Sequence, residues 1–439
     1  MNEIHSELLS SDLQETWPLL PPGDRLDGFT LLSRAEAEEF FLSLSARDQA
    51  ELLLALPLKE CRLWIRLLAP DDAADVIQAT PAAERGRLLA LLDDTTRTEV
   101  TALLAYAEDE AGGLMNPRYA RVRPDMSVDE AISYLRRQAR EQLATIYYAY
   151  VLDPQQHLLG VVSFRELFAA PGVKKVQEVM RTDMVTASEQ MDQEAVSLLF
   201  AQHDLMAIPV VDAEGHLRGI VTVDDIVDVV QEEATEDIQK IGGMEALEGP
   251  YLQIGFVRML RKRAGWLAAL FLGEMLTATA MSYYENEIAR AVVLALFIPL
   301  IISSGGNSGS QASTLVIRAM ALGEVRLRDW WRVVRRELAV GLALGTTLGL
   351  IGLLRILFWQ ALFRLYGEHF FLIGLTVACS LVGVVLYGTI AGSMLPFLLR
   401  RLGFDPASAS APFVATLVDV SGIVIYFTVA SLILRGILL

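Results

Sequence analysis

The sequence is poor in the residues and motifs on which several protein classes depend. Only two of its 439 residues are cysteines, Cys61 and Cys379, and they lie in different halves of the chain, so a structural disulfide is not expected. The opening segment, MNEIHSELLSSDLQE, has neither a basic region nor an apolar core, and we expect no signal peptide. The phosphate-binding pattern Gly-x-x-x-x-Gly-Lys-Ser/Thr is also absent. We therefore expect neither an ATP-hydrolysing enzyme nor a disulfide-stapled domain.

Basic residues are scarce in the first part of the chain. Residues 1–257 contain 21 Lys and Arg against 45 Asp and Glu, a balance of −24, whereas residues 258–439 contain 16 against 9, a balance of +7; together these give the net charge of −17. Phosphate contacts need Lys and Arg, so the acidic part is poorly suited to nucleic acid and well suited to cations. An acidic segment joined to an apolar, mildly basic one indicates a soluble region followed by a membrane domain.

Residues 1–115 have the periodicity of short helices. Apolar residues recur at three- and four-residue spacing, in segments separated by breaks that contain Pro or paired Asp. Successive helices of this kind predict a small α-superhelix. Asp71, Asp72 and Asp75 stand at the start of one predicted helix, where acidic side chains complement the helix dipole. Taken alone, the pattern favours helix capping for these three residues.

Residues 116–240 contain an internal repeat. The segment HLLGVVSFREL at 157–167 aligns with HLRGIVTVDDI at 216–226. Each copy has the order helix, apolar strand, turn, apolar strand and helix, which resembles a CBS domain. We therefore expect a tandem CBS pair, which the resemblance implies is a sensory module for small ligands. Thr222 and Asp225 match a Thr-x-x-Asp pattern that contacts nucleotides such as ATP in some CBS pairs, but N-capping explains Thr222 equally well.

The second repeat and its exit are crowded with carboxylates. Between residues 205 and 257 only Arg218 and Lys240 offset them. A solvated acidic face would explain the pattern, and so would divalent cations that bridge carboxylates, because Mg²⁺ and Ca²⁺ prefer oxygen ligands. The density of like charge favours the cation interpretation. The acidic residues are Asp192, Glu194, Asp204, Asp224, Asp225, Asp228, Glu232, Glu233, Glu236 and Asp237.

Five apolar stretches follow a connecting segment. Residues 241–263 begin with Gly-Gly and end in a basic run, which predicts an amphipathic connecting helix at the membrane surface. Each later stretch is long enough to cross a hydrocarbon core about 30 Å thick. The distribution of basic residues between the stretches predicts a cytosolic N-terminal region and a C-terminus outside. The stretches lie at about 264–284, 289–317, 338–358, 371–399 and 412–434.

Polar residues interrupt three of these stretches. The last contains Asp419, and a charge at that depth costs about 2.5–3.5 kcal/mol on insertion scales. Such a residue usually faces a polar pathway, so Asp419 is the first candidate for an ion site, with a structural hydrogen bond as the alternative. The run SSGGNSGSQ at 303–311 either lines a pore or allows close helix packing, and pore lining is favoured. Glu274 could be a cation ligand, a neutral buried acid or the partner of an arginine.

Taken in order, these features resemble the MgtE-type magnesium channel and transporter family. The resemblance rests on EDEAGGLM at 108–115, on the acidic segment 221–238, on the glycine-rich segment 299–325, and on 394–422 with its FVATLVDVSG. It covers essentially the whole chain. The fold implied is a multidomain membrane protein with an α-superhelical N-terminal domain, an α/β tandem CBS pair, an amphipathic connecting helix and an all-α transmembrane domain with five helices. The expected domains are 1–115, 116–178, 179–240, 241–263 and 264–439.

The resemblance implies a homodimeric Mg²⁺ channel in the plasma membrane, with a pore along the two-fold axis. The family's pore aspartate falls on Asp419, with Ala415, Asn307 and Gly306 beside it, and an aspartate at the cytosolic mouth falls on Asp405. By the same resemblance, the cap residues in the N-terminal domain become Mg²⁺ sensors. The implied regulatory ligands are Asp71, Asp75, Asp192, Glu194, Asp204, Asp224, Asp225, Asp228, Glu233, Glu236 and Asp237.

Two positions depart from the family's pattern. Ser310 replaces the second Asn of Gly-Asn-x-Gly-Asn-Gln, and Ala411 stands where some members have Asn. We expect Mg²⁺ uptake that is driven by the electrochemical gradient and gated closed by Mg²⁺ on the acidic cytosolic region. The alternatives are a proton- or sodium-coupled transporter that uses Glu274, a CBS-bearing anion channel, and a membrane-tethered sensor without transport. The acids of the pathway and its lack of lysine argue against the anion channel.

Overall fold

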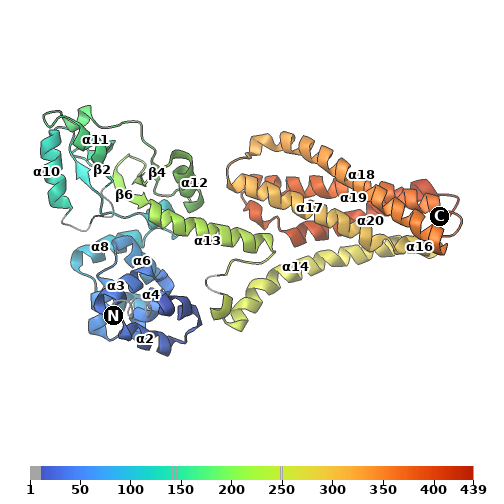
Figure 1. The fold of residues 1–439 in the computed structure, drawn as a ribbon, viewed down its shortest axis with the longest axis horizontal. Helices are drawn as coiled ribbons and strands as arrows, with labels where there is room; N and C mark the ends of the chain where they lie inside the picture. Colours follow the sequence, from blue (N-terminus) through green and yellow to red (C-terminus); the bar gives the residue numbers. More distant parts are fainter. Residues whose placement is uncertain (1–10, 140–142, 144–146, 248, 250, 439) are drawn as a thin grey trace. The chain divides into compact units, whose positions relative to one another are not determined.

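The computed structural model describes residues 11–438 apart from 140–142, 144–146, 248 and 250. The chain divides into two compact units, one that ends at Glu233 and one that begins at Ala234. In Figure 1 the first unit contains short helices and small sheets, and the second contains long helices.

The described chain up to residue 114 folds into short helices. They are η1 (Trp17–Leu19), α2 (Pro22–Leu31), α3 (Arg34–Ser43), α4 (Ala46–Ala55), α5 (Leu58–Ile65), α6 (Pro70–Ala79), α7 (Ala82–Leu89), α8 (Asp94–Leu103) and α9 (Ala111–Leu114). Ser33 and Glu36 form a reciprocal capping box at the start of α3. The apolar faces share one core, which includes Phe40, Phe41 and Cys61. The helical N-terminal domain predicted from the periodicity is confirmed.

Two copies of one α/β unit follow. The first has β1 (Arg121–Val122), α10 (Val128–Gln138), β2 (Tyr148–Leu152), β3 (Leu158–Ser163), α11 (Phe164–Ala169) and η2 (Val176–Glu178); the second has β4 (Ala187–Ser188), α12 (Gln193–His203), β5 (Ala207–Val211), β6 (Leu217–Thr222) and α13 (Val223–Ile241). The described strands form two sheets, β1-β2-β3 and β4-β5-β6, each with one parallel and one antiparallel pair. The predicted internal repeat is therefore a structural repeat.

The two copies pair with each other through backbone hydrogen bonds and stacked histidine rings. The backbone N–H of Asn116, which precedes the first copy, donates to the carbonyl of Ile220 in the second sheet (2.7 Å). The rings of His157 and His216, which occupy the same place in the two hairpins, stack with their centroids 4.3 Å apart. The tandem CBS pair expected from the sequence is thus one packed module.

The connection into the second unit differs from the single helix predicted over 241–263. Helix α13 carries the acidic segment and ends at Ile241, just before Gly242 and Gly243; Gly243 has φ +74°, a conformation that favours glycine. Residues 242–247 are not helical, and η3 (Tyr251–Gln253) comes before α14 (Phe256–Tyr283). The basic run belongs to the first turns of α14, because it continues without a break into the first apolar stretch. The two glycines stop the predicted connecting helix at its start.

Within the described residues, five helices are long and apolar enough to cross a membrane, which confirms the predicted all-α transmembrane domain. Helix α19 lies against α17, α18 and α20, and α14 packs on α20 (Figure 1). The helices after α14 are α15 (Glu285–Arg290), α16 (Val292–Ala295), α17 (Ile298–Ala321), η4 (Leu327–Asp329), α18 (Trp330–Phe363), α19 (Phe370–Arg401), η5 (Pro406–Ser408) and α20 (Ala411–Leu434).

Candidate metal centre

A pocket of about 410 Å³ lies between α14, α17 and α20. Asp419 and Ala415, one turn apart on α20, line it, as do Gly306 and Asn307 of α17. The structure therefore brings together the four residues predicted at the pore, and we refer to this site as the Asp419 pocket. Its other lining residues are Thr277, Met281, Ile298, Pro299, Ile302, Ser303, Ser310 and Ile423.

The small residues of α17 lie on two faces, of which one packs against α19 and the other lines the Asp419 pocket. A Cβ atom added to Gly388 or Gly392 of α19 would overlap the carbonyl of Gly305 or Gly309, so α17 and α19 pack at backbone distance. Gly306 and its polar neighbours face the Asp419 pocket instead. The run at 303–311 is continuous α-helix, and it both packs closely and lines a pocket.

Serine hydroxyls join α17 to the start of α20. Ser310 Oγ donates to the carbonyl of Ala411 (3.1 Å), and Ser313 Oγ donates to the carbonyl of Ala409 (2.8 Å). Ser310 and Ala411, the two positions expected to depart from the family's pattern, are thus hydrogen-bonded to each other, and Ser310 also lines the pocket.

Two polar residues of α14 stand near Asp419, although the sequence did not place them there. Glu274 lies close enough to Asp419 for the two carboxyl groups to act on each other. Thr277, almost one turn later, lines the pocket, and its hydroxyl is buried without a hydrogen-bond partner in the described part of the chain. Their i, i+3 spacing in an apolar stretch was the available signal. Helix α14 therefore adds oxygen atoms to the surroundings of Asp419.

The carboxylate of Asp405, predicted at the cytosolic mouth, accepts a hydrogen bond at each of its two oxygens. Its Oδ1 accepts a hydrogen bond from the N–H of Ala407 (2.8 Å), and its Oδ2 accepts one from Lys240 Nζ (2.5 Å). Lys240 also forms an ion pair with Glu236, one turn earlier on α13. Burial lowers the pKa of Lys240, but the bonds to Asp405 and Glu236 outweigh it and raise the pKa above its ordinary value. Two predicted metal ligands, Asp405 and Glu236, therefore share a lysine, and we call these three residues the Lys240 cluster.

Carboxylates of α6 and α13 meet in the first unit. Asp71 is 7% exposed, and its Oδ1 accepts a hydrogen bond from Asn116 Nδ2 (2.9 Å). Asp72 was not among the predicted ligands, yet it lies close enough to Asp224 and Asp228 for their charges to act on it. We call the group the α6–α13 cluster. Its members are Asp71, Asp72, Asp75, Asp224, Asp225 and Asp228.

The carboxylates of the α6–α13 cluster are difficult to ionise together. Burial, reinforced by the charges of Asp225 and Asp72, raises the pKa of Asp71 to about 8. Burial also raises the pKa of Asp225 to about 6 and that of Asp75 well above its ordinary value. The largest effects of neighbouring charges on these three pKa values all come from other carboxylates. Such a cluster is stabilised by protons or by a cation with oxygen ligands.

The remaining predicted regulatory acids have local roles. Asp192 caps α12 by accepting a hydrogen bond from the N–H of Glu194 (2.9 Å), and Asp204 ends the same helix in a left-handed conformation. Glu233 Oε1 accepts a hydrogen bond from Gln193 Nε2 (2.6 Å). Asp237 lies on α13.

Two groups of polar residues in the second CBS copy, the predicted nucleotide contacts and a trio in the hairpin turn, form hydrogen bonds or ion pairs within the copy. Thr222 Oγ1 donates to Asp225 Oδ2 (2.5 Å), so the two predicted nucleotide contacts bind each other at the start of α13. Asp212, Glu214 and His216 are spaced closely enough to hold a metal, and the sequence reasoning missed them. Arg218 already pairs with Asp212 (2.9 Å), so this trio behaves as a hairpin turn held by ion pairs.

Comparison with known proteins covers both units. Residues 298–429 match the MgtE family, described as divalent cation transporters; residues 8–109 match the MgtE intracellular N domain; and 111–172 and 176–232 match the CBS domain. The chain is 42% identical over 442 residues to the magnesium transporter MgtE of Thermus thermophilus, covering 100% of this chain and 96% of that protein. It is 29% identical to the magnesium transporter MgtE of Bacillus subtilis, over 98% of this chain and 92% of that protein. A crystal structure of the cytosolic domain of the Mg²⁺ channel MgtE in complex with ATP is 43% identical and covers 52% of this chain and 95% of that one, with a TM-score of 0.48.

Proposed function

The chain belongs to the MgtE family of divalent cation transporters, and we propose that it carries Mg²⁺ across the membrane through the Asp419 pocket. The observation that carries this proposal is the convergence of Asp419 with the oxygen-bearing and small residues of α14, α17 and α20 in one pocket. The family assignment also makes the protein a transporter and not an enzyme.

A two-fold axis would complete the site. A homodimer places a second Asp419 opposite the first, as two-fold symmetry requires. Two facing carboxylates repel unless a cation lies between them, and Mg²⁺ keeps several of its waters when it binds oxygen ligands. The site then holds a hydrated ion without removing most of its bound waters. A membrane potential of 100 mV drives two charges inward with about 4.6 kcal/mol, so no coupled reaction is required.

The α6–α13 cluster supplies the proposed gate. When cytosolic Mg²⁺ is high, an ion that bridges α6 and α13 offsets the repulsion between Asp71, Asp75 and Asp225 and favours a closed state. When Mg²⁺ is low, the same carboxylates repel, and the contact between α6 and α13 loosens. The raised pKa values of Asp71, Asp75 and Asp225 support this role, because they measure how unfavourable the cluster is without a positive charge.

A measurement of flux tests the pathway. Asp419→Asn keeps the size of the side chain and removes its charge, and we expect Mg²⁺ uptake into proteoliposomes to fall at least about tenfold, the effect of losing ~1.4 kcal/mol. Glu368→Gln removes an exposed carboxylate from the turn between α18 and α19 and is the matched control. Equal uptake by Asp419→Asn and wild type would exclude the pocket as the pathway.

The proximity of Glu274 to Asp419 favours a second candidate, a proton- or sodium-coupled transporter. A paired carboxyl group next to the ion site can exchange a proton or Na⁺ for the transported cation. Clamping the potential while the pH and Na⁺ gradients are collapsed separates the two functions. A channel keeps its Mg²⁺ flux under these conditions, whereas a coupled transporter loses it.

We further propose that the CBS pair binds ATP through Thr222 and Asp225. Asp225 can accept hydrogen bonds from ribose hydroxyls, and Thr222 stands beside it at the start of α13. Calorimetric titration of the full-length protein with ATP should give saturable binding that Thr222→Val weakens. Equal binding by this variant would remove Thr222 from the site.

A further inference from the structure

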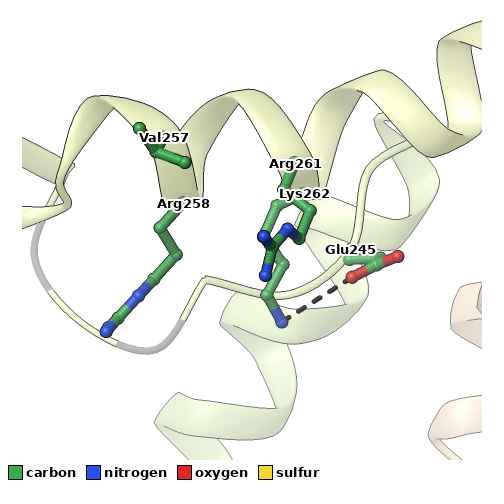
Figure 2. Close-up of a pocket in the computed structure, with 5 residues that line it drawn as sticks. All are labelled: Glu245, Val257, Arg258, Arg261 and Lys262. Carbon is green, nitrogen blue, oxygen red and sulfur yellow. Dashed lines mark ion pairs between the residues drawn. The ribbon is translucent and has the colours of Figure 1, made fainter.

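A second pocket, of about 420 Å³, lies at the start of α14, apart from the Asp419 pocket. Its walls come from the first two turns of α14 and from Glu245, which precedes the helix. Figure 2 shows the side chains of Arg258 and Lys262 extending from α14, with Lys262 directed to Glu245. We call it the Arg258 pocket, and its lining residues are Glu245, Val257, Arg258, Arg261 and Lys262.

The Arg258 pocket is positively charged and held in shape by the backbone. The N–H of Glu245 donates to the carbonyl of Lys262 (3.3 Å), and Lys262 Nζ lies 3.8 Å from Glu245 Oε2. This pair uses the pocket's one carboxylate. In the part of the chain that the structure describes, no ion pair engages Arg258 or Arg261. The pocket therefore keeps two guanidinium groups, three residues apart on one face of α14, for an external anion.

The surroundings of the pocket are apolar and exposed. Phe256, Val257 and Leu260 are 80%, 68% and 54% exposed, and they alternate with the basic residues in the first turns of α14. The same helix continues directly into the first membrane-spanning stretch. Basic and large apolar side chains together at the end of a membrane helix are typical of the headgroup region of a bilayer, where one kind meets phosphate and the other meets acyl chains.

We propose that the Arg258 pocket binds the phosphate of an anionic phospholipid headgroup, from the leaflet at the N-terminal end of α14. Arginine presents a planar set of donors that matches phosphate oxygens in pairs, so Arg258 and Arg261 hold the phosphodiester. Phosphatidylglycerol carries this phosphate without a cationic group in its headgroup, which favours it over phosphatidylcholine at a basic pocket. The exposed apolar residues beside the pocket suit a lipid and not a soluble anion. This inference depends on the membrane fold and not on the transported ion.

Native mass spectrometry of the full-length protein, titrated with phosphatidylglycerol or phosphatidylcholine in detergent, tests the site. Wild type should bind phosphatidylglycerol saturably and in preference to phosphatidylcholine. Arg258→Gln/Arg261→Gln should weaken this binding about fivefold per arginine, or roughly 25-fold in total. Arg400→Gln/Arg401→Gln, at the end of α19, removes two basic residues that do not line the pocket and should leave the affinity unchanged.

A lysine variant and competition by two soluble phosphates provide further tests. Arg258→Lys/Arg261→Lys retains both charges and should bind more tightly than the glutamine variant, which separates electrostatic loss from misfolding. Inorganic phosphate and glycerol 3-phosphate at millimolar concentration should not displace the lipid. Equal binding by wild type and the glutamine variant, equal affinity for phosphatidylcholine, or displacement by either soluble phosphate would each overturn the proposal.

Discussion

Replacing Asp71 with asparagine removes a buried ionisable group from the α6–α13 cluster and keeps the shape of the side chain. An asparagine carbonyl can still accept the hydrogen bond from Asn116 Nδ2 that Asp71 Oδ1 accepts at 2.9 Å. Burial and neighbouring carboxylates raise the pKa of Asp71 from 3.8 to about 8. Since the folded pKa exceeds the unfolded one, the folded state binds the proton more tightly. The resulting stability is complete below about pH 4 and is lost as the pH rises to about 8.

The size of the effect follows from this shift. One such group changes the free energy of unfolding by about 1.4 kcal/mol per pH unit inside that window. Neighbouring carboxylates share the free-energy cost of ionising this cluster. We therefore expect Asp71→Asn to be more stable than the wild-type protein by about a few kcal/mol at pH 8 without Mg²⁺. Added Mg²⁺ should stabilise wild type more than the variant, because the bound ion offsets the same repulsion.

The thiol of Cys61 provides the readout. It is fully buried in α5, in the same core as α6, and reacts with an alkylating reagent only when this region opens. Its alkylation rate in the full-length protein, divided by the rate in the unfolded protein at each pH, measures the opening equilibrium. Asp94→Asn, at an exposed site on α8, is the control. If Asp71→Asn opens as readily as wild type at pH 8, or if Mg²⁺ protects both equally, the reasoning is refuted.

Three other substitutions test the second unit. Lys240→Met leaves Glu236, a predicted regulatory ligand, and Asp405 without their lysine, so Mg²⁺ should bind Glu236 more readily and close the channel at lower concentration; unchanged Mg²⁺ dependence of single-channel current would contradict this. Gly392→Ala places a methyl group against a backbone carbonyl of α17 and should cost about 1–3 kcal/mol in thermal unfolding, whereas Gly265→Ala, which has open space around it, should not destabilise the protein. Ser310→Ala removes the hydrogen bond to α20 and should lower stability by about 1 kcal/mol, and equal stability would show that this bond does not join the helices.

Local sequence chemistry determined the elements of this protein. Helical spacing predicted the N-terminal helices, the repeated strand–turn–strand pattern predicted the CBS pair, and the length of the apolar stretches predicted the membrane helices. Each of these signals comes from residues within a few turns or one hairpin of each other, so no tertiary contact is needed to read them. Asp419 was also visible, because a carboxylate is rare in an apolar stretch. The helix predicted over 241–263 shows the limit of such signals, since Gly242 and Gly243 end one helix and the basic run starts another.

Tertiary structure alone decided which charges meet. A carboxylate looks the same in sequence whether it caps a helix, binds a lysine or faces other carboxylates, and the choice depends on residues far away in the chain. Asp71 on α6 is set against Asp225 of α13, and Asp405 receives the ammonium group of Lys240. The glycines of α17 likewise permit either a pore lining or close packing, and the position of α19 assigns one face to each. The sequence determined where charge and small residues occur; the packing of distant helices determined what each of them does, because side-chain pairing and burial exist only after those helices are brought together.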